Sequence, residues 1–265
     1  MEVERGLLRS AVYATDFNRY AFVGPGNERV VFPYAVGQHG YSVIEEVVMR
    51  SQYPKAYSYL AANKRALQRR KQFREWYGFS APRNLYVHDH ANLLVPLLAE
   101  RGTCAPFPPR PERFCVMASA GFSISIDIAS AGLEPTFVLG LANSKLLFWY
   151  LRLISNKFRG GWITCTKQYF GTLPIRRVDR GNRKLRSIKD AISRRVERII
   201  ALEQRHAKAG TGHEREVLRR QITAADLGID RLVYELYGLS EEEIRIVEET
   251  TAQGEGSKAG EARGV

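Results

Sequence analysis

The sequence predicts an α/β protein, of the α+β kind, in which a mixed-sheet domain is followed by an antiparallel helical hairpin. Three observations support this fold class. Short β-rich runs alternate with Gly and Pro through the first part of the chain. A long apolar segment at 136–156 then has helical character. Two amphipathic stretches separated by Gly210-Thr211-Gly212 follow, and helices joined by a short glycine turn fold back on each other.

Residues 1–50 predict short strands and turns. β-rich runs occur at 12–13, 20–23 and 30–32, and Gly-Pro-Gly-Asn at 24–27 is a strong turn signal. We therefore expect a hairpin between the last two runs. The sequence Gly-Gln-His-Gly at 37–40 predicts a second turn or loop.

The segment 54–75 predicts one helix, with Pro54 in the first turn, where proline is tolerated. It carries an imperfect apolar stripe, and its other faces hold seven Lys or Arg residues against the single acid Glu75. Further along, strands are expected at 85–87, 114–116 and 122–128. In the last of these, apolar and polar residues alternate, as in a half-buried strand. The Pro-rich segment 105–111 predicts a loop.

Residues 136–156 predict one long, mostly buried helix. Its apolar run also suits a membrane span, but Asn143, Lys145 and Arg152 lie within it, and charges at that depth are expensive in lipid. We therefore expect a core helix and no membrane partner. A basic loop at 157–161 and a strand at 162–166 come next. The aromatic residues of this stretch are expected in the core: Trp149, Tyr150 and Trp162.

The compact part ends at Leu173-Pro174-Ile175, and the composition then becomes basic and helical. Apolar residues step by three and four along two stretches, as on one face of a helix. Ser240 and Glu243 match a capping box that starts a last short helix, and the Gly- and Glu-rich chain after 251 has the composition of a disordered tail. The predicted organisation is a domain at 1–176, a helical hairpin at 177–250 and a disordered tail at 251–265.

The charge balance gives the first indication of a partner. The chain has 265 residues with 40 Lys or Arg and 28 Asp or Glu, a net charge of +12. Such an excess favours binding to a polyanion, DNA or RNA. Three Cys in no Cys-x-x-Cys arrangement argue against a disulfide scaffold or a zinc ribbon. With no secretory signal at Met1, we expect a cytoplasmic protein.

No constellation of catalytic residues is recognisable. The sequence lacks a phosphate-binding Gly-x-x-x-x-Gly-Lys loop, a Gly-x-Ser-x-Gly elbow and a His-Glu-x-x-His motif. It also lacks the Gly-rich loop and the Asn-Pro-Pro-aromatic turn of an amino-methylating methyltransferase. His88 and His90 have no obvious cluster of partner ligands, and Asp127 stands alone. We therefore predict no catalytic residue and no metal site in this chain.

Two basic segments are candidates for contacts with phosphates, because each cation there would neutralise one phosphate charge. The alternative for the helix 54–75 is a solvated face, and that for the glycines at 160–161 is a simple helix stop. The basic residues of 176–220 are expected mainly on a solvated helix surface. The predicted phosphate contacts are Lys64, Arg65, Arg69, Arg70, Lys71, Lys157, Arg159 and Lys167.

Several segments together resemble a known family. They are NSKL at 143–146, KFRGG at 157–161 and TKQYFGTLPI at 166–175, with TDFNRY at 15–20 and IDRLVYELYGL at 229–239. The helix pattern with Pro54, Leu67, Arg70 and Trp76-Tyr77 agrees with them. In this order they resemble the TaqI-like C-terminal specificity domain, the target-recognition domain of adenine-N6 DNA methyltransferases and of type IIG (Eco57I-like) restriction-modification enzymes. The likeness covers residues 4–248.

The resemblance implies sequence-specific binding of double-stranded DNA. The target adenine would be flipped into a separate methyltransferase domain, which is not in this chain. S-adenosylmethionine would bind to that missing domain, and no cofactor is expected here. A methyltransferase or nuclease domain or subunit is therefore the expected protein partner. Polar loop residues would read base edges in the major groove. The candidates are Gln38, His39, Arg83, Asn84 and His88.

Two other functions remain open from the sequence. In one, the chain is a non-catalytic protein-interaction module that docks through its helical hairpin. In the other, it is an autonomous methyltransferase, which would have to bind S-adenosylmethionine. We expect no such binding. A steep salt dependence of duplex binding distinguishes DNA recognition from the interaction module.

Overall fold

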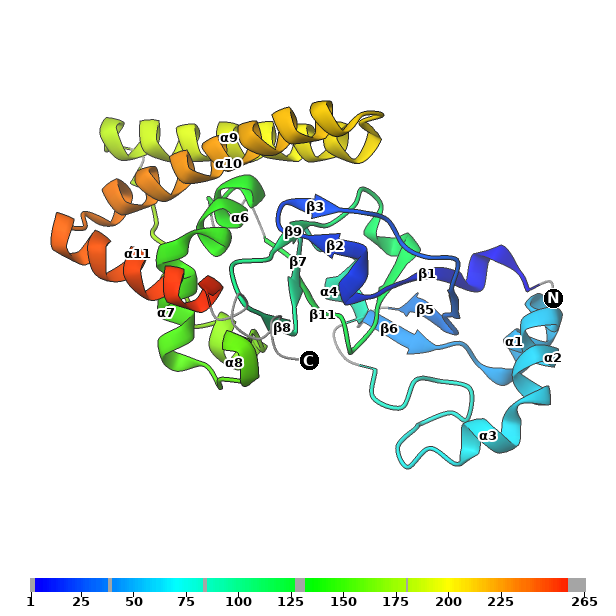
Figure 1. The fold of residues 1–265 in the computed structure, drawn as a ribbon. Helices are drawn as coiled ribbons and strands as arrows, with labels where there is room; N and C mark the ends of the chain where they lie inside the picture. Colours follow the sequence, from blue (N-terminus) through cyan, green and yellow to red (C-terminus); the bar gives the residue numbers. More distant parts are fainter. Residues whose placement is uncertain (1–2, 38–39, 83–84, 127–131, 180, 257–265) are drawn as a thin grey trace, which may run out of the picture.

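A computed structural model describes residues 3–37, 40–82, 85–126, 132–179 and 181–256. The predicted fold class is confirmed: small mixed sheets are followed by long helices (Figure 1). Two three-stranded sheets form the centre, with strand orders β10-β1-β4 and β11-β7-β9. Their strands are β1 (Leu8–Val12), β4 (Arg29–Val31), β7 (Leu93–Pro96), β9 (Ala105–Pro106), β10 (Phe114–Val116) and β11 (Gly121–Ile124).

The hairpin expected across residues 24–27 is wrong. β4 pairs antiparallel with β1, while β3 (Ala21–Phe22) pairs with β2 (Phe17–Asn18). The glycine-rich turn does connect two strands, but a turn signal does not specify which strands pair, and β1 also pairs in parallel with β10. The second turn is at the expected place: β5 (Tyr34–Gly37) and β6 (Gly40–Val43) form an antiparallel hairpin.

A helical corner follows, consisting of α1 (Glu46–Gln52), α2 (Pro54–Ala62) and α3 (Lys64–Gln68). The sequence did not predict α1, and the single helix expected over 54–75 is broken at Asn63 and ends at Gln68. The chain turns back there because Arg70 donates hydrogen bonds to the carbonyl oxygens of Leu67, Trp76 and Gly78. The turn buries Trp76 against α2 and its neighbours.

Two short segments also differ from the prediction. Residues 85–89 form the helix α4 (Leu85–Asp89) in place of the strand expected at 85–87. The strand β7 was not predicted, although it lies at the centre of its sheet and all four of its residues are buried. An all-apolar run of four residues has no alternation to mark it as a strand. The Pro-rich segment contains the two-residue strand β9.

The helix expected over 136–156 is divided into α6 (Pro135–Asn143) and α7 (Lys145–Ile154), which meet at an angle of 64°. Ser144 lies at the break with an extended backbone, and its hydroxyl accepts a hydrogen bond from the Leu147 N–H, capping α7. Among the described residues, no single helix is long and apolar enough to cross a membrane, and only this bent pair together reaches that length and composition. Most of α6 is buried.

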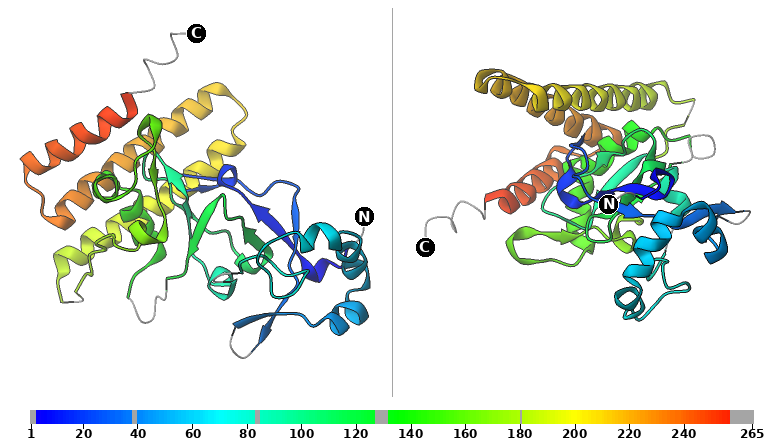
Figure 2. Two further views of the ribbon diagram at one scale, coloured as in Figure 1. Left: turned by 90° about the horizontal axis from the view of Figure 1, so that it is seen from below. Right: turned by 90° about the vertical axis from the view of Figure 1, so that its right-hand side faces the viewer.

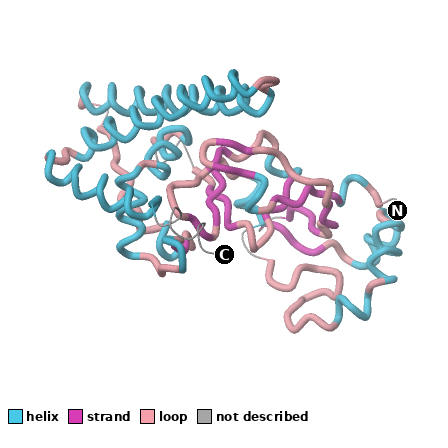
Figure 3. The backbone as a smooth tube through the Cα atoms, in the orientation of Figure 1, coloured by secondary structure: helices cyan, strands magenta, loops and turns pink. Residues whose placement is uncertain are grey.

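The helical hairpin is confirmed: α9 (Arg183–Lys208) and α10 (Gly212–Tyr237) run antiparallel and pack together along their length (Figures 1 and 2). The capping box at Ser240 starts α11 (Glu241–Gly256), because the Ser240 N–H and hydroxyl both bind the Glu243 carboxylate. α11 continues through residues 251–256, so this part of the predicted tail is helical (Figure 3). The rest of the tail lies outside the described residues.

The main hydrophobic core joins the two predicted domains. It contains Leu93 and Leu141 from the first part of the chain and Ile192, Ile229 and Val247 from the helices that follow. α9 lies directly on α6: a Cβ atom added at Gly140 would be 2.6 Å from Ile192 Cγ2. The sheets and the hairpin therefore share one interior. A domain boundary near 176 stays a prediction.

Candidate nucleic-acid interface

The first basic group lies on and just after α3. Lys64, Arg65, Arg69 and Lys71 are exposed, and none of the four forms an ion pair among the described residues. The ammonium nitrogen of Lys64 lies 4.8 Å from the centre of the Trp76 ring. Arg70, between them, differs because its guanidinium is occupied by three carbonyl oxygens. Four of the five cations predicted here are thus available to an anionic partner.

The second basic group surrounds the loop after α7. Lys157 and Lys167 are exposed, and neither forms an ion pair in the described part of the chain; Lys167 begins α8 (Lys167–Phe170). Arg159 lies in a 3-10 turn, and its side chain is outside the described residues. The glycines do not stop α7, which ends at Ile154 with an extended residue after it. They form the tip of a tight hairpin, with φ of 68° at Gly160 and 79° at Gly161.

The elements that carry the two groups, α3 and α8, lie on the same side of the molecule. In Figure 1, α3 and α8 lie at opposite ends of its lower edge, with the sheets above them, and the right-hand view of Figure 2 also places both below the sheets. α9 and α10 lie on the other side. The elements that carry both groups therefore lie on the side away from the helical hairpin.

Of the residues predicted to read bases, the structure describes only the backbone of His88. Gln38, His39, Arg83 and Asn84 lie outside the described residues, as does the side chain of His88. Among the described residues, α4 packs beside β6, and a Cβ atom added at Gly40 would be 4.0 Å from the Cβ of Tyr86. Tyr86 is 52% exposed, and its ring lies 4.6 Å from that of His90.

A buried arginine fixes this arrangement. Arg9 of β1 is 7% exposed; its guanidinium donates to Asp89 Oδ1 at 2.7 Å and to the Tyr41 hydroxyl at 2.7 Å, and lies 3.5 Å from the centre of the Phe32 ring. Tyr41 in turn donates to Asp89. Burial raises the pKa of Tyr41. The network ties α4 to β1 and β6.

The sequence patterns gave no indication of Arg9, because no local motif marks it. The network also explains the His-Asp-His segment at 88–90, because Asp89 is the partner of an arginine. Among the described residues, no group of three His, Cys, Asp or Glu side chains is arranged to hold a metal ion.

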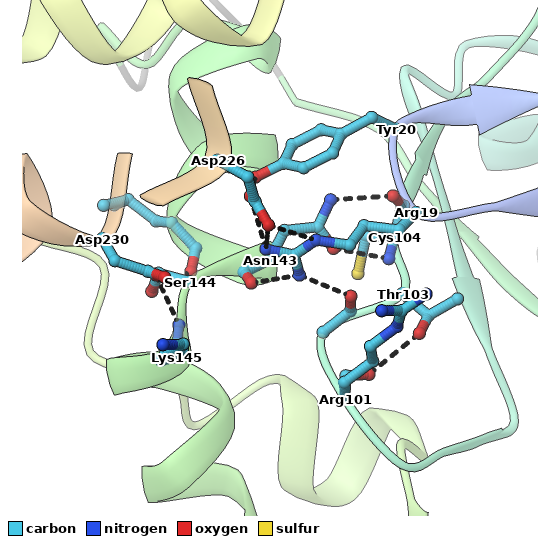
Figure 4. A network of polar contacts seen from close by, with 12 residues as sticks. Arg19, Tyr20, Arg101, Thr103, Cys104, Asn143, Ser144, Lys145, Asp226 and Asp230 are labelled. Carbon is cyan, nitrogen blue, oxygen red and sulfur yellow. Dashed lines mark hydrogen bonds and ion pairs between the residues drawn. The ribbon is translucent and has the colours of Figure 1, made fainter. Parts of the chain in front are cut away.

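A second polar network joins the sheet region to the helical hairpin (Figure 4). Arg19 donates to both carboxylate oxygens of Asp226 on α10, with the shortest N–O distance at 2.6 Å, and to the backbone oxygens of Gly102 and Asn143. The Tyr20 hydroxyl donates to the same carboxylate at 3.0 Å. We call Arg19, Tyr20, Asn143, Asp226 and Asp230 the polar junction.

The other half of the polar junction holds the start of α7. Asn143 Oδ1 accepts from the Cys104 N–H at 2.7 Å, and its amide nitrogen donates to the Cys104 carbonyl at 2.9 Å. Asp230 accepts from the Lys145 N–H at 2.9 Å. A Cβ atom at Gly102 would lie 2.5 Å from the Asn143 carbonyl oxygen, so only glycine fits there.

Burial sets the protonation behaviour of the polar junction. It raises the pKa of Asp230 to about 6, although the hydrogen bond from Lys145 opposes the shift. For Arg19, burial works against the charge, but Tyr20 and Asp226 outweigh it and the pKa is raised. Arg19 is therefore a permanent cation whose partners lie within the protein.

Three of the segments that carry the sequence resemblance contribute to the polar junction. The segments at 15–20, 143–146 and 229–239 supply Arg19, Tyr20, Asn143 and Asp230, which hold the fold together. Asp226 and Asp230 are two acids one helical turn apart beside an apolar stripe. This spacing is the sequence signal that could have identified both as members of the polar junction. The aromatic prediction is partly wrong: Trp149 and Tyr150 pack against the core, but Trp162 is 37% exposed.

Comparison with known proteins gives one distant relative. No protein-family model matches the chain. The type II restriction enzyme and methyltransferase RM.Eco57I of Escherichia coli is 24% identical over 233 residues. The match covers 85% of this chain but only 23% of that enzyme, so the chain spans less than a quarter of its relative's length. This similarity supports a role related to restriction and modification.

Proposed function

We propose that this chain is the target-recognition part of a restriction-modification system and binds double-stranded DNA sequence-specifically. The system would be an adenine-N6 methyltransferase or a type IIG enzyme. The observation that carries the proposal is the pair of basic groups at opposite ends of one side, whose exposed cations have no carboxylate partners among the described residues. The distant relative, a restriction enzyme and methyltransferase, supports it.

In this proposal the chain positions DNA for a reaction that occurs elsewhere. The cations of the two basic groups hold phosphates and set the register, while the segments joined by α4 and the β5–β6 hairpin face the base edges. The adenine is flipped into a separate methyltransferase domain, which binds S-adenosylmethionine. This chain itself contributes no catalytic residue, and its partner is that domain or subunit.

Duplex binding measured across a salt series tests the proposal. Fluorescence anisotropy with a labelled duplex pool should give an affinity that falls steeply as salt rises. Changing Lys64 and Arg65 to Ala should reduce the slope of log affinity against log salt by about 0.9 for each phosphate that is no longer neutralised. Lys208→Ala, an exposed cation at the end of α9, is the matched control and should leave the slope unchanged.

A flat salt series for the unmodified chain would contradict DNA binding and favour the protein-interaction module. An equal reduction of slope in the control would show that net charge alone governs binding. Sequence specificity is tested separately, by sequencing the duplexes that the chain retains from a random pool at moderate salt. Retention without enrichment of any motif would contradict a target-recognition function.

A further inference from the structure

The loop after α7 presents two large aromatic side chains that the proposed phosphate contacts do not use. Phe158 is 53% exposed and Trp162 is 37% exposed, and they flank Gly160 and Gly161. We call Phe158 and Trp162 the aromatic tip. Each ring therefore presents part of its surface to solvent on a short loop.

The backbone beneath the aromatic tip is firmly held. The Phe158 N–H donates to the Trp162 carbonyl at 2.7 Å, and Lys157 and Ile163 form an antiparallel bridge. Ile163 is buried in the main core within β12 (Ile163–Thr164), which pairs with β8 (Leu98–Ala99). The two glycines adopt positive φ, which lets the chain reverse within a few residues. The rings thus project from a short hairpin anchored in the core.

The charges around the aromatic tip favour a nucleic acid over a protein as its partner. Lys157 lies next to Phe158 in the sequence, and Lys167 opens α8 shortly after Trp162; both are exposed. Aromatic rings interleaved with cations bind nucleobases by stacking while the cations neutralise the backbone. Leu153 on α7 is also exposed, at 59%, and an aliphatic side chain suits a protein partner. A protein partner is therefore the competing outcome of the test.

We propose that Phe158 and Trp162 stack on nucleobases at an unstacked step of the bound duplex. The inference rests on the proposed function, because it requires DNA along the side that carries α8. Proteins that kink or open DNA insert apolar side chains in this manner, and each stacked base contributes about 1–3 kcal/mol. The aromatic tip would therefore prefer a duplex in which one step is already weakened.

Binding to two probes tests the inference: a matched duplex, and the same duplex with a central mismatch. The unmodified chain should bind the mismatched probe more tightly. Phe158→Ala and Trp162→Ala should each weaken binding about 5- to 150-fold, the equivalent of one stacked base, and abolish the preference for the mismatch. The salt slope should stay unchanged in both. Lys157→Ala should instead reduce the slope by about 0.9 and keep the preference.

Two further variants separate stacking from a structural role. Phe158→Leu keeps an apolar side chain and Phe158→Tyr keeps the ring, so stacking predicts that only the tyrosine variant retains the affinity. The inference would be overturned if the unmodified protein and the Ala, Leu and Tyr variants of Phe158 all bound both probes with equal affinity. It would also be overturned if Phe158→Leu kept the full affinity of the unmodified protein. Absence of salt-dependent binding by the unmodified chain would instead contradict the proposed function itself.

Fluorescence gives an independent readout. Stacking of a base on Trp162 should quench the indole emission when DNA is added, and Trp162→Phe should abolish that quenching while still binding. Trp76 and Trp149 are present in both proteins and provide the internal reference. Identical quenching in the two proteins would contradict stacking at residue 162.

Discussion

The polar junction and the basic groups both depend on cations, yet they use them in opposite ways. Arg19 meets the Asp226 carboxylate and two backbone oxygens, and is largely enclosed. Lys64, Arg65 and Arg69 are exposed, with no ion pair among the described residues. Residue type alone therefore does not reveal function: burial and the identity of the partners decide whether a cation supports the fold or is available to a ligand.

The largest effect is expected at the centre of the polar junction. Arg19→Ala should lower the free energy of unfolding by about 3–5 kcal/mol, because it removes the cationic partner of the Asp226 carboxylate and the guanidinium donor to two carbonyl oxygens. Urea denaturation followed by circular dichroism measures the change. Arg69→Ala is the matched control and should change stability by less than about 0.5 kcal/mol. Equal destabilisation of the two variants would remove the distinction between the regions.

A smaller loss is expected from Gly102→Ala. The added methyl group would overlap the Asn143 backbone, so we expect a decrease of about 1–3 kcal/mol in unfolding free energy. Gly210→Ala is the control, because a Cβ atom there meets no atom within 4 Å. Thermal denaturation of both variants checks the prediction. A destabilised Gly210→Ala protein alongside an unaffected Gly102→Ala protein would contradict the close approach at the polar junction.

The raised pKa of Asp230 predicts a pH dependence. The pKa of Asp230 in the folded state is about 6, above its ordinary value of 3.8, so the folded protein binds this proton more tightly than the unfolded chain does. The resulting stabilisation is fully present below pH 3.8 and is lost as the pH rises through about 6. Between pH 7 and 5 the protein should gain about 1 kcal/mol relative to Asp230→Asn, which does not titrate. Urea midpoints of both proteins at the two pH values measure this. Parallel pH profiles would show that Asp230 titrates normally.

The sharpest comparison lies within one basic segment. Arg70→Ala should cost about 1 kcal/mol or somewhat more, because three carbonyl oxygens lose their charged donor. Lys71→Ala should be nearly neutral for stability but should reduce the salt slope of DNA binding. Each variant is measured by urea denaturation and by anisotropy. The assigned roles would be wrong if Lys71→Ala lowered only the stability, or if Arg70→Ala lowered only the salt slope.

Local patterns in the sequence predicted the elements that depend on neighbours along the chain. The apolar spacing of α9 and α10 and the capping box at Ser240 are of this kind. Long-range pairing was not predictable: β1 and β10 pair across about a hundred residues, and the turn at 24–27 led to the wrong partner for β4. The break at Ser144 likewise depends on a helix packed elsewhere in the fold.

For the candidate site, residue type indicated the cations but not their surroundings. The neighbouring residues Arg69, Arg70 and Lys71 are equivalent by composition, yet only Arg70 is occupied by carbonyl oxygens. Trp162 was expected in the core because the aromatic residues mostly fall at apolar-periodic positions, whereas it is 37% exposed and follows two glycines with positive φ. Arg9 and Asp89 are 80 residues apart, so no local pattern relates them.

The shared interior of the sheets and the helical hairpin has an evolutionary consequence. Recombination between genes exchanges contiguous stretches, and a crossover near codon 176 would pair an Arg19 from one parent with an Asp226 from the other. It would also pack Gly140 of one parent against the residue at position 192 of the other parent, where the close fit between Gly140 and Ile192 could be lost. Exchanges that preserve the fold should therefore be those that carry the hairpin along, or those that replace surface loops alone.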